Sequence, residues 1–198
     1  MGHAILVHPD DLARFEELDA TAEFSPVSWM PSPLVAALSS QLGPERMARV
    51  FPMRSLQENG GRFVIASDGP LMWREPMVAI EAAITRQSPG GSGERLAPAE
   101  AIDLGTAIRA YTVNAAYLMG HEDAVGSIEE GKIADMIVLD RNLFEIPATE
   151  IGTTRVLRTI FNGSVVFDSS SDPASEESLQ EQYEVDLDLE GEQWGAVP

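Results

Sequence analysis

The stretch Arg62-Phe63-Val64-Ile65-Ala66-Ser67-Asp68-Gly69-Pro70 contains the clearest strand signal in the chain. A short β-branched run that stops at a Gly-Pro pair predicts a buried strand followed at once by a turn. Asp68 then lies at the carboxyl end of the strand. In parallel α/β architectures ligands bind at this rim, so Asp68 is a candidate for metal ligation or proton transfer. Asp before Gly-Pro is also ordinary turn chemistry, and a purely structural role for Asp68 stays open.

Helical and extended segments alternate on both sides of this strand. A short strand is predicted at residues 22–26, and it ends at a proline. Apolar residues at helical spacing predict helices from Asp10 to Leu18, from Pro44 to Phe51, from Pro76 to Ile84, and from Leu104 to Leu118 with Asp103 as the N-cap. This β/α alternation is typical of parallel strands covered by helices.

The pattern changes after Gly126 to short strands and turns. Residues 134–140 predict a strand, whose part from Met136 to Leu139 we expect to be buried. Val156 to Ile160 and Val165 to Phe167 are joined by Asn162-Gly163, the residue pair typical of a tight hairpin. The sequence therefore predicts a small β module appended to the α/β part.

The composition limits the classes of partner. The chain has 198 residues, 32 acidic against 13 basic side chains, and a formal net charge of −19, which disfavours nucleic acids and anionic membranes. It has no Cys, and no secretory signal or long apolar segment is found, so we expect a cytoplasmic protein. Residues 169–198 hold nine acidic and no basic residues and are expected to be disordered; an edge strand from Tyr183 to Glu190 is the alternative.

Three motifs resemble the C-terminal part of the metal-dependent amidohydrolases. The helix pattern Tyr111-Thr112-Val113-Asn114-Ala115-Ala116 is followed by Gly126-Ser127-Ile128-Glu129-Glu130-Gly131-Lys132-Ile133-Ala134-Asp135. Together with Ser67-Asp68-Gly69-Pro70, they resemble amidohydrolase family 3, the branch that includes N-substituted formamide deformylase-like proteins. The second motif is widespread in the superfamily, and the other two are more selective. The resemblance spans residues 1 to 168.

The resemblance implies a fold and three regions. Residues 1–122 would be the C-terminal part of a (β/α)8 TIM barrel, from the end of strand 6 through helix 8. Residues 123–168 would be a small β-sandwich module, and residues 169–198 the acidic tail.

The resemblance also implies a site. Asp68 matches the Asp that ends the eighth barrel strand, which ligates a metal, accepts a proton from metal-bound water and passes it to the leaving nitrogen. His3 matches the His that ends the sixth strand, a metal ligand or a polariser of the substrate carbonyl. Zinc is the divalent metal most expected in the full-length family. Trp29 and Trp73 lie in loops on the expected rim and are candidates to line the substrate pocket, although aromatic residues commonly just cover a loop.

The chain departs from the family pattern in its metal ligands. It has three His residues and no His-x-His pair, and it begins where the sixth strand should be ending. One His and one Asp are too few for a catalytic metal, which usually takes three or more protein ligands. We therefore expect the chain alone to be inactive.

Two hypotheses follow for function. In the first, the chain is part of a hydrolase that cleaves non-peptide carbon–nitrogen bonds of small amide-type substrates. In the second, it is a non-catalytic truncated product, or a subunit that completes a barrel with a separate N-terminal chain or as a homo-oligomer. Unpaired strand edges in two complete barrel strands are compatible with such an association.

Overall fold

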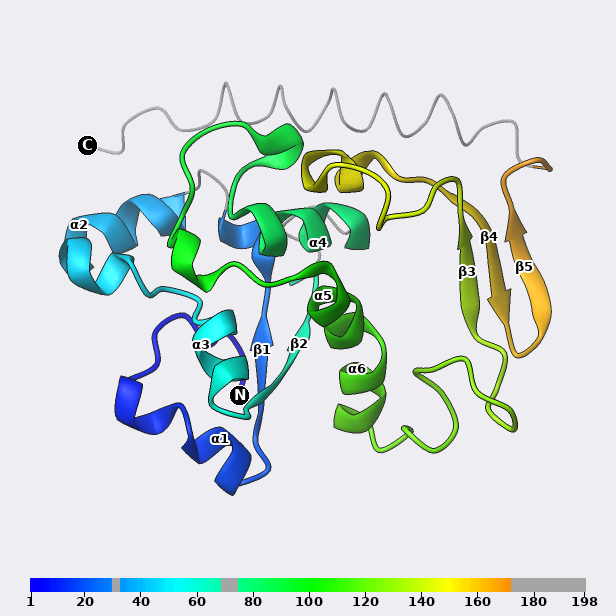
Figure 1. Cartoon of the computed structure of the whole chain (residues 1–198), viewed down its shortest axis with the longest axis horizontal. Helices are drawn as coiled ribbons and strands as arrows, with labels where there is room; N and C mark the ends of the chain where they lie inside the picture. Colours follow the sequence, from blue (N-terminus) through cyan, green and yellow to red (C-terminus); the bar gives the residue numbers. More distant parts are fainter. Residues whose placement is uncertain (30–32, 69–74, 172–198) are drawn as a thin grey trace, which may run out of the picture.

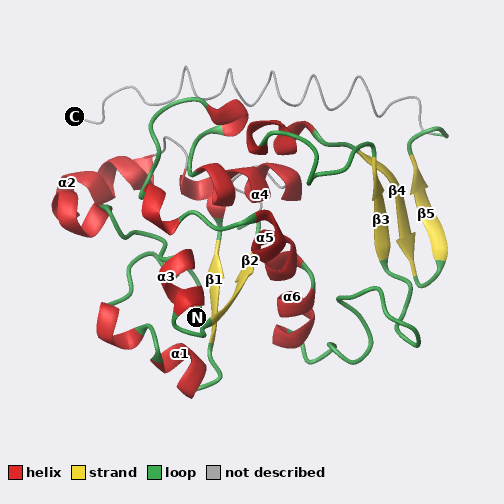
Figure 2. Cartoon of the chain, viewed as in Figure 1, coloured by secondary structure: helices red, strands yellow, loops and turns green. Residues whose placement is uncertain are grey.

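The computed structural model describes residues 1–29, 33–68 and 75–171, in which helices and short strands alternate before a mainly β region (Figures 1 and 2). The α-helices and strands are α1 (Arg14–Glu17), β1 (Thr21–Phe24), α2 (Pro33–Met47), α3 (Met53–Glu58), β2 (Arg62–Ile65), α4 (Pro76–Thr85), α5 (Leu104–Tyr111), α6 (Val113–Leu118), β3 (Met136–Leu139), β4 (Val156–Phe161) and β5 (Ser164–Asp168). The 3-10 helices are η1 (Pro9–Asp11), η2 (Pro26–Trp29), η3 (Pro89–Gly91), η4 (Pro98–Glu100) and η5 (Ala148–Thr153).

Strands β1 and β2 form a parallel pair at the centre of the α/β part. Thr21 lies opposite Arg62 and Phe24 opposite Ile65. Figure 1 shows α3 on one side of the pair and α5 and α6 on the other, and all three helices contact β2. Because helices cover it on two sides, the pair carries apolar residues on both faces, as buried parallel strands do. The predicted strand before Asp68 is thus confirmed.

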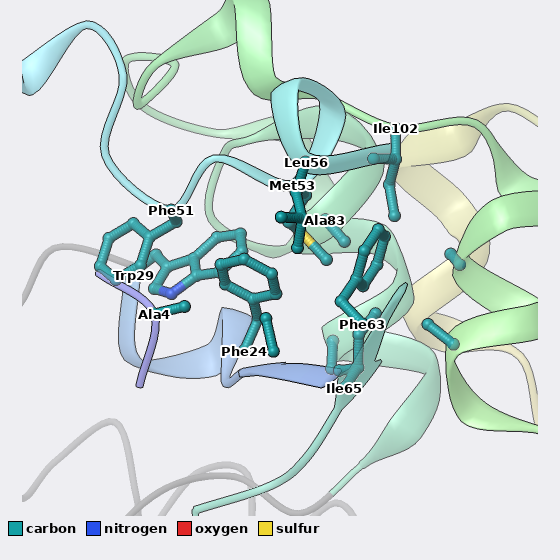
Figure 3. Packing of buried hydrophobic residues seen from close by; sticks show 14 of the residues in the cluster. Ala4, Phe24, Trp29, Phe51, Met53, Leu56, Phe63, Ile65, Ala83 and Ile102 are labelled. Carbon is teal, nitrogen blue, oxygen red and sulfur yellow. The ribbon is translucent and has the colours of Figure 1, made fainter. Parts of the chain in front are cut away.

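Aromatic side chains form much of the core next to this pair (Figure 3). The Phe24 ring lies edge-on to Phe63 with ring centroids 5.6 Å apart, and edge-on to Trp29 at 6.2 Å. Trp29 in turn stacks on Phe51 at 4.5 Å. Such pairs each contribute about 0.5–1.5 kcal/mol beyond the area they bury. The loops that carry Trp29 and Phe51 are therefore fixed to the strand core.

The single helix predicted from Leu104 to Leu118 is wrong, because the structure breaks it into α5 and α6. The break falls at Thr112, whose φ of −118° and ψ of −91° are not helical. Its hydroxyl donates to the Ile108 carbonyl at 2.8 Å, the type of local bond by which Thr competes with the helix ladder. The predicted cap at Asp103 is confirmed, since its carboxylate accepts from the Thr106 amide at 2.8 Å.

The predicted helical stripe that ends at Val50 and Phe51 is also wrong in part. Helix α2 has a kink at Gly43, where Pro44 starts its second half, and the helix ends at Met47. Phe51 has a φ of +52° and precedes Pro52. A residue before proline is pushed out of the α region, so the helix cannot continue here. Val50 and Phe51 are nevertheless buried, as loop residues.

Strands β3, β4 and β5 form a separate antiparallel sheet in the order β3-β4-β5. The predicted hairpin is confirmed, with Asn162 and Gly163 both at positive φ. The expected burial of Met136 to Leu139 is wrong, because Ile137 and Val138 are 48% and 41% exposed. Figure 1 shows why, since the sheet stands at one end of the described chain, beyond α5 and α6. Apolar residues of this sheet, among them Phe161, Val165 and Val166, are therefore exposed.

Two expectations stay predictions. The region boundaries at residues 122 and 168 stay predictions, and so does the β-sandwich, since the described residues of the β region contain one sheet and not two. Tyr183 to Glu190 and the rest of the acidic tail beyond residue 171 lie outside the described residues. No helix among the described residues is long and apolar enough to cross a membrane.

Candidate active site

Asp68 lies where the sequence predicts, just beyond the carboxyl end of β2. The Ala66 amide still donates to the Phe24 carbonyl at 2.9 Å, so the parallel pairing runs to within two residues of Asp68. Asp68 itself has a φ of +54°, in the left-handed region that Asp tolerates better than most residues. Its side chain is 36% exposed. The carboxylate is therefore open to solvent at the edge where parallel α/β folds bind ligands.

His3 is held beside the same edge by main-chain bonds to β1. The Met1 amino group donates to the Thr21 carbonyl at 2.7 Å, the Glu23 amide to the Met1 carbonyl at 2.9 Å, and the Ala4 amide to the Glu23 carbonyl at 3.1 Å. The first residues thus run alongside β1 in the same direction. His3 has a φ of +50° and a side chain that is 58% exposed.

The structure brings His3 and Asp68 together. His3 Nε2 lies 3.7 Å from Asp68 Oδ1, and His3 Nδ1 lies 3.9 Å from Glu23 Oε2. These are ion-pair distances, longer than hydrogen bonds. The imidazole therefore stands between two carboxylates, one on each side of the ring.

Sequence reasoning missed Glu23. Its side chain is 21% exposed, while its strand neighbours Ala22 and Phe24 are buried. Glu23 Oε1 accepts from the Ser25 hydroxyl at 2.6 Å, and Oε2 accepts from the His3 amide at 2.9 Å. A carboxylate in the middle of a short apolar strand was the available signal, because such a group is rarely placed there without partners.

A cavity of about 240 Å³ opens beside His3 and Asp68. Its lining is mostly apolar: Ala4, Ile5, Phe24, Trp29, Leu34 and Phe51 join Ser25, His3 and Asp68. Trp29 thus lies at the candidate site, as the sequence suggests, although it is only 6% exposed and is packed into the core. Trp73 lies outside the described residues.

The wall formed by Trp29 and Phe51 is braced by Arg86. This buried side chain donates to the carbonyls of Leu96 at 2.8 Å, Val50 at 3.0 Å and Phe51 at 3.4 Å. Its guanidinium carbon lies 4.3 Å from the centroid of the Trp29 ring. Burial lowers the pKa of Arg86 to about 10, so it is still a cation at neutral pH. A cation over an indole face is attracted to it.

The metal-ligand set is incomplete among the described residues. No group of three or more His, Asp and Glu side chains lies close enough there to hold a metal ion. His3 and Asp68 are two donors of suitable chemistry, whereas catalytic zinc usually has three protein ligands. The described part of this chain therefore does not fit a complete metal centre.

The fold is similar to that of metal-dependent hydrolases. It is similar to that of an uncharacterized metal-dependent hydrolase from Pyrococcus furiosus, with a TM-score of 0.58 and 26% identity over 71% of this chain and 28% of that chain. It is also similar to an adenosine deaminase from Xanthomonas campestris with bound Zn, with a TM-score of 0.61 over 95% of this chain and 42% of that chain. At 19% identity, that second likeness concerns the fold alone.

The sequence profile of the amidohydrolase family matches residues 1–167, and the chain belongs to this family. Among its relatives is an N-substituted formamide deformylase from Arthrobacter pascens, 36% identical over 115 residues. The matched part is 58% of this chain and 21% of that protein. The chain thus spans about a fifth of the length of this curated relative.

Proposed function

We propose that this chain supplies the C-terminal part of the active site of an amidohydrolase family 3 enzyme that hydrolyses non-peptide carbon–nitrogen bonds. Residues 1–122 would then run from the end of strand 6 to helix 8 of a (β/α)8 barrel, with residues 123–168 in an appended β-sandwich. The parallel β1–β2 pair and the small share of the relatives' length that the chain covers support this proposal. The chain is incomplete as a catalyst in this view.

One observation carries the proposal. His3 and Asp68 come from segments more than 60 residues apart, yet their side chains meet 3.7 Å from each other beside a cavity. A carboxylate and an imidazole at the carboxyl edge of parallel strands can exchange protons with a bound substrate. This arrangement supports the proposed hydrolysis of a C–N bond.

Asp68 would act as general base and then general acid. It accepts a proton from the water that attacks the substrate carbonyl, and it returns this proton to the nitrogen as the C–N bond breaks. His3, when it carries a proton on Nε2, polarises the carbonyl oxygen. Trp29, together with Trp73 outside the described residues, would line the pocket for the rest of the substrate. An N-substituted formamide is the first substrate class to test, since a deformylase is among the relatives.

A divalent metal, zinc by the resemblance, belongs to the proposed complete enzyme. His3 and Asp68 would be two of its ligands. The other ligands would have to come from outside the described residues, among which no three His, Asp or Glu side chains are placed to hold one metal ion.

A second candidate is a non-catalytic subunit that completes a barrel with a separate N-terminal chain. The exposed apolar residues of the β3-β4-β5 sheet favour it, because they leave a surface suited to burial by another polypeptide. Both candidate functions assume that the chain derives from the same family. They differ in whether its residues take part in catalysis.

The test combines metal analysis with complementation. We expect the purified chain to hold substoichiometric zinc and to release no formate from an N-substituted formamide. When the chain is mixed with a segment that carries the first barrel strands and the His-x-His pair of a family member, we expect it to gain zinc and activity. Asp68→Asn should lower that activity about 100-fold or more. Stoichiometric zinc and formate release by the chain alone would contradict the incomplete site. Complementation in which Asp68→Asn keeps full activity would leave only the subunit role.

A further inference from the structure

We propose that Glu23 is the positioning residue that holds His3 against Asp68. The proposal rests on the proposed function, in which the imidazole and the carboxylate work together. It goes further, because it assigns the geometry of that pair to a strand residue that does not itself touch Asp68 in the contacts described above.

Glu23 clamps the chain on both sides of His3. Its backbone amide donates to the Met1 carbonyl at 2.9 Å, and its carbonyl accepts from the Ala4 amide at 3.1 Å. Its side-chain Oε2 accepts from the amide of His3 itself at 2.9 Å. A single residue of β1 therefore fixes residues 1 to 4 through three hydrogen bonds.

The side-chain bond falls where the backbone most needs support. His3 has a φ of +50°, a left-handed conformation that costs free energy for a residue with a side chain and persists only when its surroundings hold it. At this conformation the His3 amide points to Glu23 while the ring reaches toward Asp68. Without the acceptor, an extended backbone at His3 would be favoured and would carry the imidazole away.

The Glu23 carboxylate is itself anchored. Its other oxygen, Oε1, accepts from the hydroxyl of Ser25 at 2.6 Å. Glu23 and Ser25 are two positions apart in an extended segment, so their side chains lie on the same side of it. Ser25 is 3% exposed and lines the cavity. A buried hydroxyl thus fixes the carboxylate that fixes His3.

Two substitutions separate positioning from charge. Glu23→Gln keeps an oxygen that can accept from the His3 amide, whereas Glu23→Ala removes the acceptor. Hydrogen exchange of the His3 amide, measured by NMR on the full chain, should be at least tenfold faster in Glu23→Ala and close to wild type in Glu23→Gln. Glu17→Gln, an exposed acid on α1, is the matched control and should change nothing.

A second readout follows the imidazole. In the wild-type background, Asp68→Asn should shift the ring resonances of His3 and leave those of His8 and His121 in place. In the Glu23→Ala background the same change at Asp68 should produce little shift, and Glu23→Gln should restore most of it. A residue that merely stabilised the fold would not alter the effect of Asp68→Asn on the ring resonances of His3.

The outcomes are distinct. Equal shifts of the His3 ring in all three backgrounds would overturn the proposal, as would slow exchange of the His3 amide in Glu23→Ala. If Glu23→Ala fails to fold, the absence of any His3 ring shift between wild type and Asp68→Asn would still refute the pair that Glu23 is proposed to hold. None of these measurements needs substrate or metal. Failure of the positioning role is therefore distinguishable from failure to hydrolyse an amide.

Discussion

Asn114 donates its side-chain amide to the main-chain carbonyl of Phe63 at 2.8 Å, joining α6 to β2 across 51 positions of sequence. Phe63 lies opposite Ala22 in the register of the two strands, so the bond attaches α6 directly to the parallel β1–β2 pair. Asn114 belongs to the helix motif that resembles the family pattern, so at least one polar residue of that motif has a structural task.

Removing this link should weaken the fold. We expect Asn114→Ala to lower the free energy of unfolding by about 1–2 kcal/mol, because a partly buried carbonyl loses its partner. Urea unfolding followed by circular dichroism measures the change. The neighbouring Val113→Ala, at a position that is 40% exposed, is the control and should alter stability by less than about 0.5 kcal/mol. Equal effects of the two substitutions would show that the bond contributes little.

Gly126 should be intolerant of a side chain for two reasons. Its φ is +94°, and a Cβ there would lie 2.6 Å from the Ala116 Cβ and 3.2 Å from the Thr112 carbonyl oxygen. Gly120 has a φ of +68° but nothing within 4 Å of its Cβ position. We expect Gly120→Ala to cost about 1 kcal/mol of stability and Gly126→Ala at least ~2 kcal/mol. Thermal unfolding of the two variants side by side tests the difference, and a smaller loss for Gly126→Ala would disprove the steric contact.

Arg86 should be needed for the wall of the cavity. Arg86→Met keeps much of the side-chain length but leaves three carbonyl groups without their donor, which should cost about 3 kcal/mol. Arg46→Met, on the exposed side of α2, should cost less than about 0.5 kcal/mol. Because Arg86 lies over the Trp29 ring, the emission of Trp29 in a Trp73→Phe, Trp194→Phe background should shift to the red in Arg86→Met only. An unchanged spectrum would show that Arg86 does not order the indole.

The cap at Asp103 should give a pH-dependent contribution to stability. The Thr106 amide that donates to Asp103 lowers the pKa of this carboxyl in the folded chain. The contribution is therefore present above the ordinary aspartate range and is lost as the pH falls through the lowered folded pKa. We expect Asp103→Ala to cost about 1 kcal/mol at pH 7 and the gap to wild type to narrow toward pH 2. Asp103→Asn keeps an acceptor without the charge, so its stability gap to Asp103→Ala should not depend on pH.

The parts of the fold that sequence predicts well depend on local chemistry. The strand before Asp68, the Asp103 cap and the Asn162-Gly163 hairpin each follow from residues within a few positions of one another. The position of Asp68 at a strand edge is predictable for the same reason. Its pairing with His3 is a long-range contact, which the resemblance to the family suggests and which residue patterns alone do not.

The misses arise where tertiary contacts overrule local pattern. The apolar stripe from Leu104 to Leu118 is continuous, yet the chain breaks at Thr112, and Asn114 of α6 bonds to β2 just beyond the break. Ile137 and Val138 have strand-forming side chains, but a pattern that predicts burial does not say which element provides the cover. Glu23 escaped notice because its importance comes from three bonds to residues some 20 positions earlier.

The left-handed backbone at Asp68 makes this position well suited to a variant protein that binds its substrate without cleaving it. Asparagine adopts such a conformation as readily as aspartate does, so Asp68→Asn should remove the proposed proton acceptor and leave the backbone at position 68 unchanged. Under the proposed function, a completed enzyme that carries Asp68→Asn should bind its amide and leave it uncleaved, so that the bound ligand can be isolated from a metabolite extract and identified by mass.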